Sequence, residues 1–306
     1  MPYPVASGAV SHAGTLINEI WAPKFLIKFY EATVMNSIAN TEYEGTISNQ
    51  GDTVHINITP DITINDHVKG QKLVYEHPAS SLVDLLIDKG KSYSFACSDI
   101  DKKQSPLNFI EKWTDDASKQ MKISIERSIY ADIYSDADSA NAGNTAGLLS
   151  GDIVLGATGS PVTVTNANII DYILRLGLCL DEQDVPAEER WCILPANMCK
   201  LLKDSDLKDA SLAGDGNKSS LITGRIGIID RFEIFNSNLL TLTTDGADTV
   251  ANIIAGHKSA LTFASQLVEN EVIRAEQEFA DYARGLQVYG YKVVKPTALC
   301  HGYATV

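Results

Sequence analysis

The chain has 306 residues, of which 44% are hydrophobic and 21% are charged. Length and composition favour a globular protein of one large domain or two modest ones, and they exclude wholesale disorder, a collagen-like fibre and a disulfide scaffold. The formal net charge is −14. Because such a surface repels phosphate groups, it argues against sequence-specific nucleic-acid binding and against docking on an anionic membrane.

The sequence carries no sign of export or membrane insertion. No apolar run approaches the ~20 residues of a membrane span, and residues 1–18 lack the Lys or Arg expected at the start of a signal peptide. The five cysteines are widely spaced and form no CxxC pair. We therefore expect reduced, buried thiols in a protein made in the cytoplasm.

Residues 1–98 predict an arm, a helix and a long hairpin. Residues 1–18 are small and uncharged, which predicts an extended arm, and the apolar spacing over 22–39 predicts an amphipathic helix that stops near Asn40. Alternation over 53–59 predicts a strand ended by Pro60, and a second β-like run spans 82–97 with a break at Gly90. A hairpin with so little hydrophobic mass must lie on another surface.

A long amphipathic helix is predicted over 106–136. Ser105 and Pro106 are a favoured N-cap and first-turn residue, and no Gly or Pro follows until Gly143. A one-sided stripe on a helix of roughly 45 Å predicts that the helix braces a sheet. The stripe recurs every three or four positions, at Ile110, Trp113, Ala117, Met121, Ile125, Ile129 and Ile133.

The remainder of the chain predicts a transition followed by an α/β region. Residues 138–168 are small and polar, so they hold short strands at most and mark a domain boundary. Helices are predicted over 168–180 and 196–203, and strands over 190–194, 226–229, 231–235 and 251–255. A loop is expected at 204–220 and a turn at Asp245-Gly246, and residues 271–294 predict one or two long strands.

The motifs of catalysis and cofactor binding fail when their spacing is tested. Gly90-Lys91-Ser92 would need a glycine at Leu85 to form a P-loop, and the residues that follow it are strand-like. The six histidines form no HExxH pattern, and Cys199 lies in an apolar helical run typical of a core. The acidic pairs, such as Asp181-Glu182, are expected to be solvated. We therefore predict no catalytic, cofactor-binding or metal-binding residues, and no enzymatic activity.

An arm and a hairpin that cannot bury themselves predict self-association. The order of the elements resembles the HK97-type major capsid fold of tailed bacteriophages, an α+β fold, and the resemblance spans nearly the whole chain. The stretches that carry it are Trp21-Ala-Pro-Lys-Phe, Tyr43-Glu-Gly-Thr-Ile, Gly51-Asp-Thr-Val-His-Ile, Ile62-Thr-Ile-Asn-Asp, Ile87-Asp-Lys-Gly-Lys-Ser-Tyr-Ser-Phe, Asp99-Ile-Asp-Lys-Lys-Gln, Ala255-Gly-His-Lys-Ser-Ala-Leu, Phe279-Ala-Asp-Tyr-Ala-Arg-Gly-Leu and Tyr289-Gly-Tyr-Lys-Val-Val-Lys-Pro.

The resemblance implies a division of the chain and a function. It implies an N-terminal arm and first helix at 1–40, an extended hairpin (the E-loop) at 41–98, a P domain with the spine helix at 99–164, an α/β A domain at 165–262, and long P-domain strands with a C-terminal return at 263–306. The implied function is self-assembly, as pentamers and hexamers, into an icosahedral shell around double-stranded DNA. The shell would form in the host bacterial cytoplasm and become the virion capsid.

Partners and contacts follow as expectations. The capsid body starts within about 20 residues of Met1, so we expect a separate scaffolding protein, together with a portal and a possible decoration protein. An acidic shell would leave the enclosed DNA mobile, without sequence-specific binding. Candidate contacts between subunits are Lys69 and Lys72 in the hairpin tip, Arg284 in a terminal strand, and Trp21.

Three alternatives are weighed against a capsid. An encapsulin-like compartment shares the fold and would be distinguished by its genome neighbours. An enzyme that uses the α/β region predicts a clustered acid–base or nucleotide site. A monomeric binding module that uses residues 60–80 predicts a stable monomer.

Overall fold

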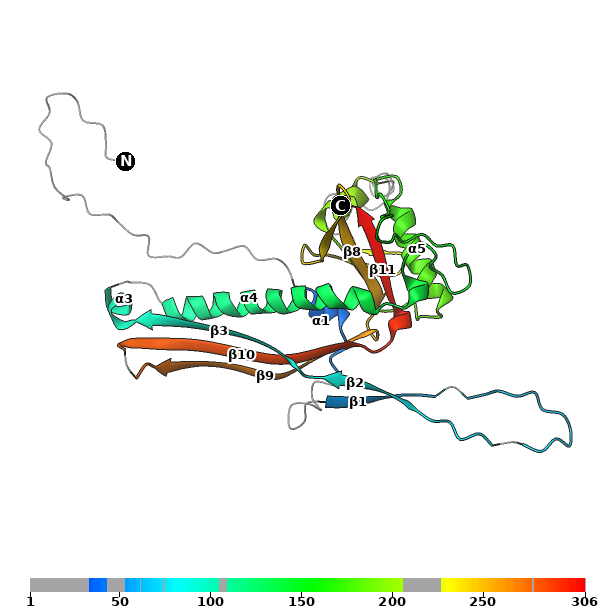
Figure 1. The fold of residues 1–306 in the computed structure, drawn as a ribbon, viewed down its shortest axis with the longest axis horizontal. Coiled ribbons are helices and arrows are strands. Elements are labelled where there is room, and N and C mark those ends of the chain that lie inside the picture. The colour runs from blue at the N-terminus through cyan, green and yellow to red at the C-terminus, as the bar shows by residue number, and fades with distance from the viewer. Residues whose placement is uncertain are drawn as a thin grey trace, which may run out of the picture.

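The computed structural model describes residues 33–42, 53–60, 62–73, 75–104, 109–205, 227–276 and 278–305. The protein has three parts in these residues (Figure 1). A long platform of helix and sheet carries a compact domain on one side at one end. From beneath the same end, a hairpin projects away from the platform. The expected helix over 22–39 falls mostly outside the described residues, which contain its last turn as α1 (Met35–Ile38).

The platform is a three-stranded antiparallel sheet with a long helix lying along it. Its strands are β3 (Lys89–Ser98), β10 (Ala280–Val293) and β9 (Leu261–Arg274), in the order β3-β10-β9. The helix α4 (Phe109–Asp132) continues into a 3-10 turn, η1 (Ile133–Asp136), and α3 (Asp99–Gln104) lies at the far end. The prediction of a long helix that braces a sheet is confirmed.

Burial along α4 follows the predicted stripe over half of its length. Met121, Ile125, Ile129 and Ile133 are buried, whereas Trp113 keeps 38% of its surface exposed. Full burial of such a side chain stabilises a fold by about 1.5–3 kcal/mol. The C-terminal half of α4 is therefore buried in the core of this subunit, and the N-terminal half leaves apolar surface exposed.

The compact domain is built on a six-stranded sheet with the order β11-β8-β4-β6-β5, and β7 also pairs with β8. Its helices are α5 (Ile169–Glu182) and α6 (Ala196–Lys203), which confirms the helices predicted over 168–180 and 196–203. Its strands are β4 (Arg190–Leu194), β5 (Ile228–Ile229), β6 (Phe232–Asn236), β7 (Leu242–Asp245), β8 (Asp248–His257) and β11 (Leu299–Thr305). Because β11 pairs with β8, the C-terminus returns to this domain.

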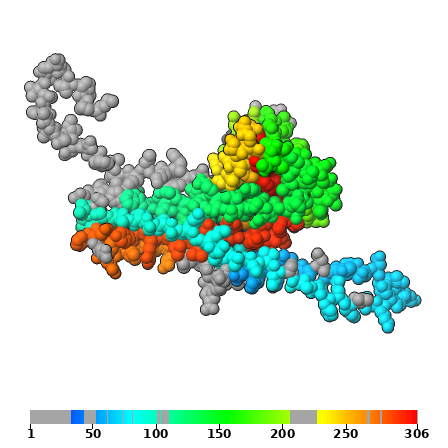
Figure 2. All heavy atoms as spheres, viewed as in Figure 1, coloured from blue at the N-terminus to red at the C-terminus, as the bar shows by residue number. Residues whose placement is uncertain are grey.

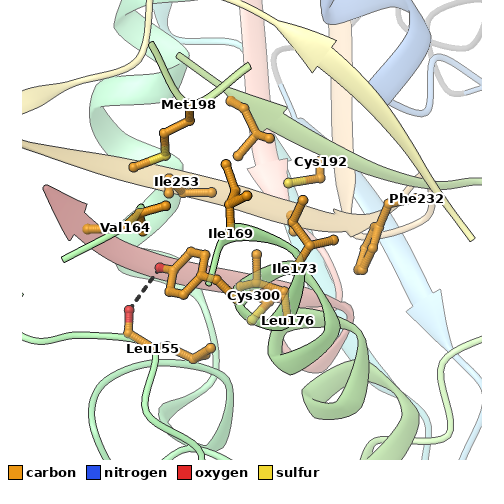
Figure 3. Packing of buried hydrophobic residues seen from close by; sticks show 14 of the residues in the cluster. Leu155, Val164, Ile169, Ile173, Leu176, Cys192, Met198, Phe232, Ile253 and Cys300 are labelled. Carbon is orange, nitrogen blue, oxygen red and sulfur yellow. Dashed lines mark hydrogen bonds between the residues drawn. The ribbon is translucent and has the colours of Figure 1, made fainter. Parts of the chain in front are cut away.

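Strand alternation divides the interior into two cores. Cys192 and Leu194 of β4 point toward α5 and α6, and Figure 3 shows this cluster gathered between helix and sheet. Trp191 and Ile193, on the opposite face of β4, pack with residues of α4. The first core also contains three further cysteines, and all five cysteines are free and buried. The sheet thus joins the compact domain to the platform.

The hairpin is a two-stranded ribbon with a long exposed end. Strands β1 (Thr53–Ile58) and β2 (Ser81–Leu86) pair antiparallel, with Thr53 opposite Leu86. Residues 62–73 and 75–80 form its loop, and a turn lies at 69–70. The root rests on the platform through a small cluster of Ile56, Leu85, Ile87 and Ala264.

Three expectations about boundaries need correction. The break in the second β-like run falls after Leu86, and Gly90 lies inside β3. Strand β3 pairs with β10 of the platform, so residues 89–98 are not part of the hairpin ribbon. The long strands begin at Leu261, ten residues earlier than expected.

Residues 138–164 also pack differently from the expected P domain. Ala146, Leu155 and Val164 are buried in the core of the compact domain, and Val162 forms a bridge with Ala304. This stretch contains the short helix η2 (Ser139–Asn141). Its apolar residues are too widely spaced to predict a strand. They reach the core because the stretch runs alongside β11, the edge strand of the compact-domain sheet.

Candidate assembly surfaces

The hairpin loop exposes several large apolar side chains. Figure 2 shows the hairpin standing clear of the rest of the molecule. Its exposed apolar side chains, with exposures from 63% to 90%, are Ile62, Ile64, Val68, Leu73 and Tyr75. Contiguous apolar exposure on a soluble protein marks an interaction site.

The loop has an ordered turn despite lacking a core. Gly70 adopts φ +91°, a left-handed conformation that favours glycine, and the N–H of Gln71 donates to the carbonyl of Val68 at 2.9 Å. The carboxylate of Glu76 accepts from the N–H of Thr63 across the loop at 2.7 Å. Lys69 and Lys72 flank the turn and form no ion pair with any described residue.

A groove runs between α4 and β3 on the platform. It has a volume of about 430 Å³ and is lined by Tyr93, Phe95, Trp113 and Met121 among others. The rings of Phe95 and Trp113 meet edge to face, with centroids 5.6 Å apart. The hairpin of the same subunit points away from the α3 end of the platform (Figure 1), and none of its residues lines this groove. Its own hairpin therefore does not cover the groove.

The α3 end of the platform carries exposed apolar side chains next to a pair of salt bridges. The guanidinium of Arg274 on β9 pairs with Asp99 at the start of α3 and with Asp281 on β10, the latter at 3.1 Å. The N–H of Asp99 donates to the carbonyl of Phe279 at 3.0 Å. Phe279 is 83% exposed and Ile100 is 63% exposed. The ion pairs hold these two side chains outward at the end of the sheet.

The predicted contact residues are placed in different ways. Arg284 lies on β10 opposite Glu271 of β9 and forms an ion pair with it inside the subunit. Trp21 lies outside the described residues. Lys69 and Lys72 are exposed at the hairpin turn. The structure does not bring the four residues together, and their contacts with other subunits stay a prediction.

Asp181 is exposed, as expected, and its carboxylate also bridges two arginines. The side chain of Arg190 is 1% exposed and pairs with Asp181 at 2.7 Å, and Arg231 reaches the other oxygen of this carboxylate at 2.5 Å. Desolvation acts to raise the pKa of Asp181, but hydrogen bonds from Arg231 and Arg190 outweigh it and hold the pKa below its usual value. The ion pair between Asp181 and Arg231 connects the end of α5 to the turn between β5 and β6. No spacing rule relates residues 181, 190 and 231.

The neighbouring Glu182 also has a structural role that the sequence did not reveal. Its carboxylate accepts from the backbone N–H groups of Leu149 and Ser150, at 2.8 and 3.2 Å. Gly147, just before them, has φ +103°. The loop is thereby fixed so that Leu149 is 82% exposed on the compact domain.

The described residues offer little for chemistry. They contain no group of three or more His, Cys, Asp or Glu side chains arranged to hold a metal ion. Burial raises the pKa of the Cys199 thiol to about 11, so it stays protonated at neutral pH. Gly90 and Lys91 lie in a strand, which removes the geometry of a P-loop. No helix in the described part of the chain is long and apolar enough to cross a membrane.

Known protein structures settle the fold. No protein-family profile and no curated protein matches the chain. A solved structure from Mycobacterium phage Che8 is 29% identical, covers 94% of this chain and 96% of its own, and superposes with a TM-score of 0.75. The chain therefore has the HK97-like fold of tailed-phage major capsid proteins.

Two further similar structures are phage capsids. The capsid structure of the cyanophage P-SCSP1u is 16% identical and covers 94% of this chain and 93% of its own, with a TM-score of 0.73. The capsid of Ralstonia phage GP4 is 14% identical and covers 98% of both chains, with a TM-score of 0.66. Because these matches span hairpin, platform and compact domain together, the capsid fold accounts for the whole chain. Neither an encapsulin-like compartment nor an enzyme is favoured.

Proposed function

We propose that this chain is the subunit that self-assembles, as pentamers and hexamers, into the icosahedral shell of a tailed phage. The observation that carries the proposal is the projecting hairpin. A two-stranded ribbon alone is marginally stable in water, yet this one exposes five large apolar side chains beyond its paired strands. In a capsid, a neighbouring subunit would provide the surface that covers these side chains.

The hairpin of one subunit lies, in this proposal, across the platform of the next. The groove between α4 and β3 supplies an aromatic floor in Phe95 and Trp113. The hairpin supplies aliphatic and aromatic side chains such as Ile64 and Tyr75. Burial of apolar surface from both sides would drive the contact, and a repeated head-to-tail contact of this kind closes a ring.

Charge then sets the register of the contact. Lys69 and Lys72 lie at the hairpin turn, and α4 carries carboxylates on its exposed side near the groove, Asp115 and Asp116 among them. Asp115 already holds Lys119 at 2.7 Å. Partly exposed ion pairs of this kind steer association and orientation more than they add affinity.

The domain division stays part of the proposal. The N-terminal arm and first helix keep residues 1–40, and the E-loop is limited to 41–88. The P domain takes 89–137 and the long strands of 263–306, and the A domain takes 138–262 together with the C-terminal return. The strand pairing assigns 89–98 to the platform, and packing assigns 138–164 to the compact domain. In a shell the compact domain would face the centre of each pentamer or hexamer.

Other partners are proposed from the same role. A shell needs an opening for DNA, hence a portal, and a protein to set its curvature, hence a separate scaffolding protein; a decoration protein is a further possibility for the outer face. The net charge of −14 suits an inner wall that does not hold DNA tightly. Assembly would take place in the host cytoplasm, and the product would be the virion capsid.

Replacing residues 62–80 by a short turn tests the hairpin directly. Because the replaced loop contributes nothing to the buried clusters, the shortened chain should fold with the thermal stability of the full chain. It should form no closed particles by electron microscopy. Particles of normal size and yield from the shortened chain would contradict the proposal.

A further inference from the structure

The N-terminal arm joins the platform at a buried carboxylate. Glu126 lies in the middle of α4 and is 2% exposed. Its two oxygens accept the N–H of Val34 at 3.0 and 3.1 Å, and one of them also accepts the hydroxyl of Tyr130 at 2.7 Å. These donors are neutral, so among the described residues the buried carboxylate is stabilised by hydrogen bonds to uncharged groups.

The segment held by Glu126 is the base of the arm. Downstream of Val34, Met35 and Ile38 of α1 are buried, and Asn40 exchanges backbone hydrogen bonds with the start of β9: its N–H donates to the carbonyl of Leu261 at 2.8 Å, and its carbonyl accepts from Phe263 at 3.0 Å. Glu126 is the polar contact at the upstream end of this segment.

Among the described residues, one charged side chain, that of Lys122, lines the pocket beside Glu126. On α4, Lys122 lies one turn before it, is exposed, and lines with it a pocket of about 160 Å³. From the arm, this pocket is lined by Thr33, Met35 and Asn36, which carry no charge; from β9 and β10 it is lined by the neutral Phe263 and Gln287. Tyr289 of β10 shares the buried core cluster with Tyr130, and Tyr93, Tyr134 and Tyr291 pack against that cluster.

We propose that Glu126 is a proton-controlled clamp on the base of the N-terminal arm. When the arm base lies on α4, the carboxylate is out of water. When the base lifts, the carboxylate regains water and an ordinary pKa near 4.5. Ionised Glu126 therefore favours the lifted state, and protonated Glu126 favours the clamped state.

The sign of the pH dependence follows from the two states. Desolvation raises the pKa of Glu126 in the clamped state, although hydrogen bonds from Val34, Tyr130 and Met35 oppose it. Protons thus bind the clamped state more tightly, and the clamp strengthens as pH falls through the raised pKa. Each unit of difference between the two pKa values changes the clamping equilibrium tenfold. At neutral pH the ionised carboxylate thus holds the arm base less tightly than the protonated carboxyl does in acid.

Hydrogen exchange of residues 33–40 in the purified full-length chain, between pH 5 and 8, tests the clamp. After correction for intrinsic exchange, protection in the wild type should rise as pH falls. Glu126→Gln keeps the acceptor and removes the charge, so it should protect these residues at every pH. Glu126→Ala should leave them unprotected at every pH, and Glu188→Gln, in an exposed loop, should behave as the wild type.

Two outcomes would overturn the proposal. One is wild-type protection that does not change with pH. The other is a Glu126→Gln variant as unprotected at neutral pH as Glu126→Ala. Tyr130→Phe supplies a second variant, because it removes one donor and keeps the charge. The hydrogen bond from Tyr130 lowers the pKa of Glu126, so in Tyr130→Phe the pH at which protection is half-maximal should rise. An unchanged pH midpoint of protection would also contradict the clamp. The readout is independent of shell formation, so failure of the proposed function would not affect it.

Discussion

Gly290 of β10 lies directly against Leu86, the last residue of β2. A Cβ added at Gly290 would stand 2.1 Å from the carbonyl oxygen of Leu86 and 2.9 Å from its carbonyl carbon. The close approach lets the hairpin cross the platform at its root, beside the register shift between Val288 and Tyr289. The direction in which the hairpin leaves the subunit is therefore set by the absence of one side chain.

Gly290→Ala should displace the hairpin root and impair assembly. The added methyl group meets backbone, which cannot rotate aside, and overpacking of this kind costs about 1–3 kcal/mol. We expect thermal unfolding a few degrees lower and a large loss of closed particles by electron microscopy. Gly90→Ala in β3 is the matched control, because its nearest neighbour would be the Gln287 carbonyl at 3.9 Å. Normal assembly of Gly290→Ala would contradict the role of this crossing.

Shortening the side chain of Ile173 should destabilise the compact domain. This side chain of α5 has no exposed surface and packs between helix and sheet (Figure 3). Ile173→Ala should destabilise the domain by about 2–5 kcal/mol, from lost burial and the cavity left behind. Denaturant unfolding measures this value. Leu178→Ala, on the same helix with 46% exposure, should cost far less, and equal losses would contradict the packing.

Charge reversal at Lys69 and Lys72 should weaken assembly without unfolding the subunit. Both side chains are exposed and unpaired among the described residues, so their substitution leaves the subunit's stability within about 0.5 kcal/mol. If they meet carboxylates of a neighbouring platform, the Lys69→Glu, Lys72→Glu double variant should assemble more slowly, most clearly at low salt. Light scattering follows the rate. Lys200→Glu on α6 is the control, and equal rates for both variants would reject the contact.

Acid should destabilise the compact domain through His301. Burial lowers the pKa of His301 to about 4, and its Nε2 lies 3.0 Å from the Oδ1 of Asn252. The unfolded chain binds the proton near pH 6.5, so the stability from neutral His301 is complete above that pH and is lost as pH falls toward 4. The loss is at most about 3 kcal/mol.

His301→Gln should flatten this dependence in urea unfolding at pH 7.5 and 4.5, because the amide cannot take up a proton. His67→Gln, in the exposed hairpin loop, should keep the wild-type dependence. An unchanged pH dependence in His301→Gln would show that the acid loss arises elsewhere.

The local apolar pattern predicted the elements that carry a signature of their own. The strand expected over 190–194 and the helix over 196–203 match β4 and α6, because each carries its own apolar pattern and a clear stop. It failed where burial depends on distant partners. The sequence places the break in the β-like run over 82–97 at Gly90, whereas the split between hairpin and platform falls after Leu86 and is decided by pairing with β1 and β10.

The surfaces were harder to predict than the fold. The exposed apolar character of the hairpin follows from its composition, but the groove between α4 and β3 requires Trp113 and Phe95 to meet across 18 positions of sequence. Glu126 gave no signal, since a glutamate on a long helix is ordinarily solvated. Its burial depends on Val34, 92 positions away.

Electron microscopy of the purified full-length chain tests the central claim most directly. The chain would be expressed alone and together with the protein encoded immediately upstream of it. The account predicts closed shells of uniform size under at least one of these conditions, and shells that need the second protein would identify it as the scaffold. A monodisperse monomer under both conditions would contradict the account.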